Sequence, residues 1–133
     1  MLGWVGDIER ETLDNGTFRT VIFTGDHTQL TLMSLQPGED IGLEQHDGVD
    51  QFIRIEQGRA RVELGRSEDT PDETHDVEDD WAVIIPAGIW HNVVNTGDGE
   101  LKLYSLYSPP EHPDGTVHRT KQEAEAAERA HHG

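Results

Sequence analysis

The fold of this chain is decided by the stretch Gly38–Gly58, which reads GEDIGLEQHDGVDQFIRIEQG. It overlaps the turn signal Pro37-Gly38 and ends in an alternation of apolar and polar residues. Glu44 and His46 lie two positions apart within it, and residues i and i+2 of an extended strand share one face. We therefore expect the carboxylate and the imidazole to point into the same space, where both could bind one metal ion.

A second block, Pro86–Asn95, reads PAGIWHNVVN and brings one further imidazole, that of His91. Neutral imidazole is the commonest protein ligand for zinc and its neighbours in the first transition row. We interpret the two blocks as the halves of one metal site inside a small β-barrel. The alternative for either histidine is a hydrogen-bonded structural role, and the alternative for Glu44 is a solvated surface acid.

This arrangement resembles the cupin superfamily. The first motif of that family is Gly, five residues, His-x-His, three or four residues, Glu, six residues and Gly, and the matching positions here hold Gly38, Glu44, His46, Gln51 and Gly58. The second motif is Gly, five residues, Pro-x-Gly, two residues, His, three residues and Asn, and the matching positions hold Asp80, Pro86, Gly88, His91 and Asn95. The spacing is kept, whereas Glu44, Gln51 and Asp80 replace the usual His, Glu and Gly.

The resemblance implies an all-β fold, a double-stranded β-helix or jelly-roll barrel, with a short C-terminal helix. It further implies one cupin domain over residues 1–133, with the first motif at 38–58, the second at 80–95 and the helix at 120–130. The text around the last strand is similar to small cupins described as mannose-6-phosphate-isomerase-like, which by itself is no evidence of that activity.

The resemblance adds Gln51 as a fourth ligand to Glu44, His46 and His91. An amide oxygen is a weak donor, and the alternative for Gln51 is a hydrogen bond beside the site. Asp50 is chemically better, but strand alternation points it to the other face. The set of two imidazoles, one carboxylate and one amide suits one divalent ion, and does not distinguish Zn, Fe, Mn, Ni and Co.

Short apolar runs separated by turn signals indicate antiparallel strands along the chain. The expected strands cover residues 18–24, 29–35, 51–57, 59–64, 81–85, 90–95 and 101–108. Residues 65–74 are polar and are expected to form a loop between the motifs, and 81–85 are expected to be buried. Only the tail has helical composition, and residues 1–16 suggest no regular element.

Several polar side chains near these motifs leave their roles open. Tyr104 and Tyr107 have opposite strand parity, so one of them is expected to face the cavity. His112 and His118 flank a turn and are expected in a surface strap. Arg54 is expected to point away from the interior, and no basic cluster for a sugar phosphate is apparent, which weakens that choice of substrate.

Charge is the strongest compositional signal. The 133 residues carry 27 acidic and 10 basic side chains, for a formal charge of −17, and contain no cysteine. Such a surface repels nucleic acid and anionic membranes, and it fits either a solubility-tuned protein or a halophilic one. No apolar run is long enough for a membrane span and no signal peptide is visible, so we expect a cytoplasmic protein and, from the sheet edges, a homodimer.

Three functions stay open at this point. The first is a metal-dependent isomerase or epimerase acting on a small hydroxy-carbonyl or sugar-type substrate. The second is a non-catalytic module that binds a small molecule. The third is an iron or nickel dioxygenase, which the replacements at Glu44 and Gln51 disfavour.

Overall fold

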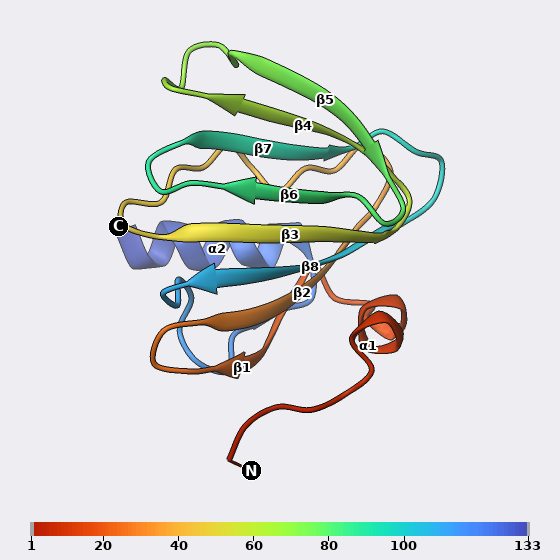
Figure 1. The fold of residues 1–133 in the computed structure, drawn as a ribbon, viewed down its shortest axis with the longest axis vertical. Helices are drawn as coiled ribbons and strands as arrows, with labels where there is room; N and C mark the ends of the chain where they lie inside the picture. Colours follow the sequence, from red (N-terminus) through yellow and green to blue (C-terminus); the bar gives the residue numbers. More distant parts are fainter. Residues whose placement is uncertain (1, 133) are drawn as a thin grey trace.

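The computed structural model describes residues 2–132, in which the chain forms two antiparallel sheets and two helices (Figure 1). The larger sheet has six strands, in the order β6-β3-β8-β2-β1-β9, and the smaller has three, in the order β5-β4-β7. The strands span Arg19–Thr24, Gln29–Leu35, Asp50–Gln57, Arg59–Gly65, Glu73–Glu78, Ala82–Ile85, Trp90–Asn95, Leu101–Ser108 and Val117–His118, numbered β1 to β9. Helix α1 covers Ile8–Asp14 and α2 covers Lys121–His132. The predicted all-β fold is therefore confirmed.

The apolar alternation sets which side of each strand faces the core. In β3, Ile53 and Ile55 are fully buried and Gln51 lies on the same face, while Arg54 is partly exposed on the other. Apolar side chains from both sheets meet in one core, which includes Met33, Leu35, Val62, Val93, Leu101 and Leu103. A hydrophobic interior between two sheets is the ordinary way to bury strands that are apolar on one face.

Two special backbone positions turn the chain between the sheets. Gly58 joins β3 to β4 with φ +107°, and a side chain there would meet the backbone at Glu100 and Leu101. Asp80 has φ 72°, and it is the one non-glycine residue with positive φ in the described chain. It occupies the motif position where glycine is usual. Asp tolerates this left-handed conformation better than most residues, which explains how the turn survives the replacement.

Three expectations about individual elements were wrong. Residues 8–14 form helix α1, capped by Asp7, whose carboxylate accepts a hydrogen bond from the Arg10 backbone. The predicted loop ends in strand β5, which is almost wholly exposed and therefore lacks an apolar alternation. Of residues 81–85 only Ile85 is buried: β6 is an edge strand of the six-stranded sheet, and Trp81 and Ile84 are 50% and 69% exposed.

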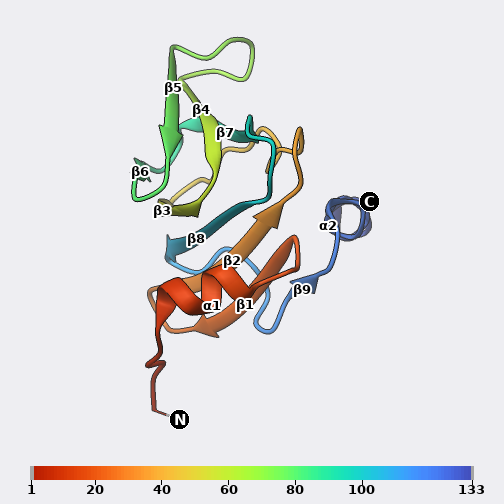
Figure 2. The same ribbon diagram turned by 90° about the vertical axis from the view of Figure 1, so that its right-hand side faces the viewer.

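The C-terminal helix α2 lies beside the sheets and follows the short strand β9 (Figure 2). Thr120 caps it by accepting a hydrogen bond from the Glu123 backbone, and Glu123 accepts one from the Arg119 backbone. Its one buried side chain in the core is that of Ala124, among the residues whose burial is described. Neither α1 nor α2 combines the length and the apolar character that crossing a membrane requires.

Candidate metal centre

Backbone pairing brings the two sequence blocks together. The segment that carries Glu44 and His46 was expected to be an extended strand, but it forms no regular strand. Its Glu44 instead forms an isolated bridge with His91 of β7. The Glu44 amide donates to the His91 carbonyl at 2.9 Å, and the His91 amide donates to the Glu44 carbonyl at 2.8 Å. Two positions later, the Gly88 amide donates to the His46 carbonyl. Backbone hydrogen bonds therefore join the two blocks at the positions from which their side chains converge.

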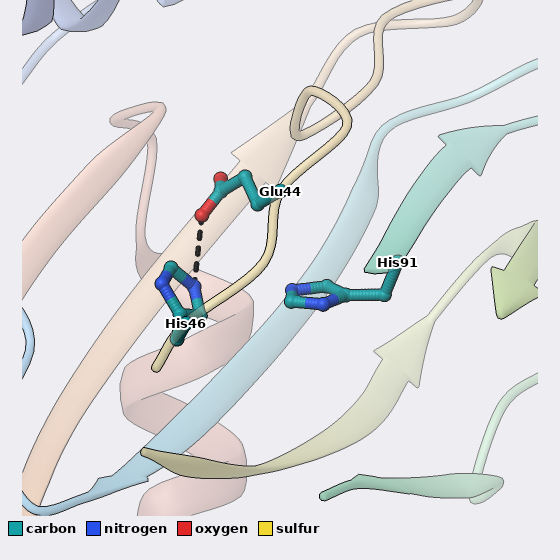
Figure 3. A group of neighbouring side chains, drawn as sticks. All are labelled: Glu44, His46 and His91. Atoms are coloured by element: carbon teal, nitrogen blue, oxygen red, sulfur yellow. Dashed lines mark ion pairs between the residues drawn. The ribbon is translucent and has the colours of Figure 1, made fainter. Parts of the chain in front are cut away.

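The side chains of Glu44, His46 and His91 converge on one point (Figure 3). One donor atom from each lies within 4.8 Å of the others, a spacing that one ion could bridge. Glu44 Oε2 lies 2.9 Å from His46 Nε2, and the centroids of the two imidazole rings are 5.3 Å apart. In Figure 3, His91 reaches toward this pair from the opposite strand.

Each imidazole is held through the nitrogen that faces away from the cluster. His46 Nδ1 lies 3.1 Å from Glu111 Oε1, and His91 Nδ1 lies 3.1 Å from the Ile89 carbonyl oxygen. Carboxylates and backbone carbonyls hold metal-binding histidines in the same manner, leaving Nε2 for the ion. His91 Nε2 is buried and has no hydrogen-bond partner within the described part of the chain, whereas His46 Nε2 faces Glu44 Oε2.

Gln51 stays a hypothetical ligand, with a buried side chain on β3. Its amide nitrogen donates to Ser105 Oγ at 3.3 Å, which fixes the orientation of the amide. The oxygen Oε1 is buried and has no hydrogen-bond partner in the described residues. Native proteins leave few buried polar atoms unpaired, so this oxygen is available to a ligand in the interior.

Opposing effects set the charges of the cluster. Burial lowers the pKa of His46, but hydrogen bonds with Glu111 and Glu44 outweigh it and raise the pKa to about 9. Burial lowers the pKa of His91. Burial raises the pKa of Glu44, yet its interaction with His46 more than compensates and leaves the pKa below its ordinary value. Without an ion, a proton on His46 balances its two carboxylates, and an ion bound at Nε2 would replace that proton.

The cluster opens onto a pocket of roughly 560 Å³, a size typical of small-molecule sites. Glu44 and His46 line it together with residues from β1, β9, α2 and the segment after β8. The remaining lining residues are Arg19, Leu43, Gln45, Trp90, Glu111, His112, Pro113, Thr116, His118, Ala127 and Glu128. The barrel interior therefore combines candidate metal ligands with a space for a small molecule.

The structure resolves most of the other residue roles left open above. Tyr107 is the buried tyrosine, with its ring edge-on to His46 at 5.9 Å, while Tyr104 contacts Phe52 on the other face. Burial raises the pKa of Tyr107, so its hydroxyl stays protonated. Arg54 points outward as predicted, toward Asp80.

His112 and His118 do not lie in a mere surface strap, because both line the pocket. The His112 ring packs edge-on against Tyr107 at 5.1 Å, and burial lowers its pKa to about 4. Trp90, next to His91 in the sequence, also borders the pocket.

Among the pocket residues that were missed from the sequence, Arg19 and Glu111 are the two that carry the proposals below. Arg19 is 2% exposed at the start of β1, where the alternation in β1 puts Arg19 and Val21 on the buried face. That alternation was a usable signal. Glu111 lies in an irregular segment after Pro109-Pro110, where no periodicity predicts the direction of a side chain.

Comparisons with known proteins agree with this fold. The sequence profile described as "Cupin domain" matches residues 31–107. The Bacillus subtilis protein YrkC is 59% identical over 94% of this chain and 67% of its own length. Protein L612 of Acanthamoeba polyphaga mimivirus is 44% identical over 86% of this chain and 70% of its own. The crystal structure of BH2720 from Bacillus halodurans is 56% identical, with a TM-score of 0.91 over 92% of this chain and 93% of that one.

Proposed function

The chain belongs to the cupin family, and on that premise we propose that it is a metal-dependent isomerase or epimerase of a small hydroxy-carbonyl compound of the sugar type. The proposed ligands of one divalent ion are Glu44, His46 and His91, with the Gln51 oxygen as the fourth. Zn, Fe, Mn, Ni and Co all suit this donor set.

One observation carries the proposal. The buried Nε2 atom of His91 has no hydrogen-bond partner among the described residues, and one ion could bridge His91, His46 and Glu44, of which His46 and Glu44 line a pocket of small-molecule size. A buried unpaired nitrogen of this kind destabilises a fold unless something binds it. A cation would pair with the His91 nitrogen and replace the proton between His46 and Glu44, and the opposite nitrogens of both rings are already held in the way metal-binding histidines require.

A bound divalent ion would supply a Lewis acid that polarises a substrate carbonyl. The chain must then move a proton to and from the carbon next to that carbonyl. Glu111 supports this role, because its carboxylate lines the pocket beside His46. The hydrogen bond with His46 lowers the pKa of Glu111, so the group is ionised and able to accept a proton at neutral pH.

Deuterium exchange tests the reaction directly. The protein is incubated in D₂O with small aldoses, ketoses and their uronic acids, and NMR follows exchange at the carbon next to the carbonyl. Exchange is expected to stop on chelation and to return with one added metal, whose stoichiometry elemental analysis gives. Indifference to chelators would contradict the proposal.

The variant Glu111→Gln separates proton transfer from binding, because an amide oxygen can still accept the hydrogen bond from His46. It is expected to retain the metal and lose at least about 100-fold in exchange rate. Exposed Glu68→Gln, in the loop before β5, serves as the matched control.

A non-catalytic binding module is the second candidate. Two contacts favour it: Gln51 already hydrogen-bonds Ser105, and Glu111 is already engaged by His46. A protein that binds metal and sugar-type compounds but exchanges no deuterium would support this function. Oxygen uptake with Fe(II) in the same samples would instead indicate a dioxygenase.

A further inference from the structure

The pocket contains a buried cation that the proposed reaction does not use. Arg19 is 2% exposed and lines the pocket from the first position of β1. The neighbouring strand β9 pairs with it there, so that Arg19 lies opposite His118. The guanidinium is therefore fixed by two strands on the pocket wall.

This guanidinium has few partners for a buried charge. Its Nη1 lies 3.3 Å from His118 Nδ1, and its centre lies 5.4 Å from the Phe18 ring. Arg19 Nε is buried without a hydrogen bond, and the residues that the structure describes provide no carboxylate in ion-pair contact with Arg19. A buried charge without a counter-ion destabilises a fold substantially, so such groups are normally paired.

We propose that Arg19, assisted by His118, binds the carboxylate of a small organic acid in this pocket. Guanidinium presents a planar fork of donors that matches a carboxylate. The same pocket is bordered by Glu44, Glu111 and Glu128, which repel a dianion more than a monoanion. A single carboxylate therefore fits better than a phosphate.

The remainder of the ligand extends toward the Glu44–His46–His91 cluster. This half of the inference rests on the proposed function, and it makes the substrate a hydroxy-carbonyl acid, such as a sugar acid, bound at both ends. Carboxylate binding by Arg19, the other half of the inference and here called the Arg19 half, does not depend on the metal.

Calorimetric titration tests the Arg19 half with matched probes. D-glucuronate is compared with D-glucose, glycolate with glycolamide, and inorganic phosphate is titrated alone. The wild type is expected to bind at least one of the acids about tenfold or more tightly than its uncharged partner. Arg19→Gln is expected to abolish that preference, and Arg19→Lys to retain part of it. Exposed Arg59→Gln, which removes the same charge outside the pocket, is expected to behave as the wild type.

Thermal unfolding separates binding from a structural role. Arg19→Gln removes a buried charge that has no carboxylate in ion-pair contact among the described residues, so its Tm without ligand is expected to equal or exceed that of the wild type. A clear fall in Tm, a carboxylate preference that survives in Arg19→Gln, no preference in the wild type, or tighter binding of phosphate would each overturn the inference.

Metal content, measured on the same samples, distinguishes this failure from failure of the proposed function. Arg19-dependent acid binding in metal-free protein that takes up no ion would leave the Arg19 site standing and overturn the metal-dependent reaction. Metal-dependent deuterium exchange in a protein whose acid binding does not depend on Arg19 would support the metal-dependent reaction and overturn the Arg19 site.

Discussion

At the scale of single residues, Gln51 tests how the proposed ion is held. Its oxygen is buried without a partner, and its position is one where cupins usually carry glutamate. We expect Gln51→Glu to tighten divalent-metal binding about tenfold, or ~1.4 kcal/mol, because a carboxylate is a stronger ligand than an amide. Competition with a chelating dye measures the affinity. The metal-free variant should be less stable than the wild type, since its new carboxyl group is buried.

The control for this variant is Gln57→Glu, which adds the same charge at the exposed end of the same strand. It is expected to leave the metal affinity unchanged. If Gln51→Glu also leaves it unchanged, Gln51 lies outside the coordination of the ion and serves only to hydrogen-bond Ser105.

A second residue, Gly58, tests the turn between the two sheets. Its φ of +107° disfavours any other residue, and an added Cβ would lie 3.1 Å from the Glu100 carbonyl oxygen and 3.2 Å from Leu101 Cα. We expect Gly58→Ala to lower the free energy of unfolding by about 2 kcal/mol, as measured by urea denaturation. The control is Gly99→Ala. Gly99 precedes Glu100 in the sequence and has open space around its Cβ position, so this change should alter the free energy of unfolding little.

At the scale of secondary structure elements, one ion pair adds to the packing of Ala124 in docking α2. Lys121 opens the helix and donates to Asp40, which also accepts a hydrogen bond from Asn92 at 3.0 Å. Burial raises the pKa of Asp40, but Asn92 and Lys121 outweigh this and hold the pKa below its ordinary value of 3.8. The helix is thereby attached to the segment that carries Glu44.

This attachment predicts a pH dependence. Because the folded-state pKa of Asp40 is lowered, its contribution is present above about pH 3.8 and is lost as the pH falls through the folded-state value. Lys121→Met is expected to lose about 0.5–1 kcal/mol at neutral pH. Its stability should approach that of the wild type as the pH falls below 3.8, whereas a difference that persists in acid would contradict the role of Asp40.

Strands that turn residues bound on both sides could be predicted from the sequence, and the other elements could not. The expected bounds of β2, β7 and β8 agree with the structure, because each is a short run of strand-forming residues between turn signals. Helix α1 is short and buries only Thr12, and β5 is exposed along nearly its whole length, so neither carries a periodic apolar signal. The run at 81–85 is apolar yet lies at a sheet edge, a position that composition does not reveal.

The candidate site divides in the same way. Glu44, His46 and His91 could be predicted because motif spacing and backbone pairing fix where they meet. Glu111 could not, because its approach to His46 depends on the path of an irregular segment. The alternation in β1 predicts that Arg19 is on the buried face, but only the pairing with β9 shows that it faces the pocket.

At the scale of the whole molecule, the formal charge of −17 is distributed unevenly. Exposed acids are concentrated on β5 and the loop before it, namely Glu68, Asp69, Asp72, Glu73, Asp76 and Glu78. Arg59 is the nearest cation to Glu78, at 3.9 Å, and both side chains are exposed. Exposed pairs of this kind add little stability, so repulsion among the acids outweighs them at low ionic strength.

Screening this repulsion should stabilise the fold. The Debye length falls from roughly 30 Å at 0.01 M salt to about 3 Å at 1 M. If screening contributes about 1 kcal/mol, Tm should rise by roughly 4 °C between these KCl concentrations, as followed by circular dichroism. Replacing Glu73, Asp76 and Glu78 with their amides should raise Tm at low salt and shrink the response to KCl. Sucrose, which stabilises proteins without screening charge, should raise the Tm of the wild type and of this variant equally. A Tm that does not change with KCl would contradict adaptation to high salt and favour solubility as the reason for the acidic surface.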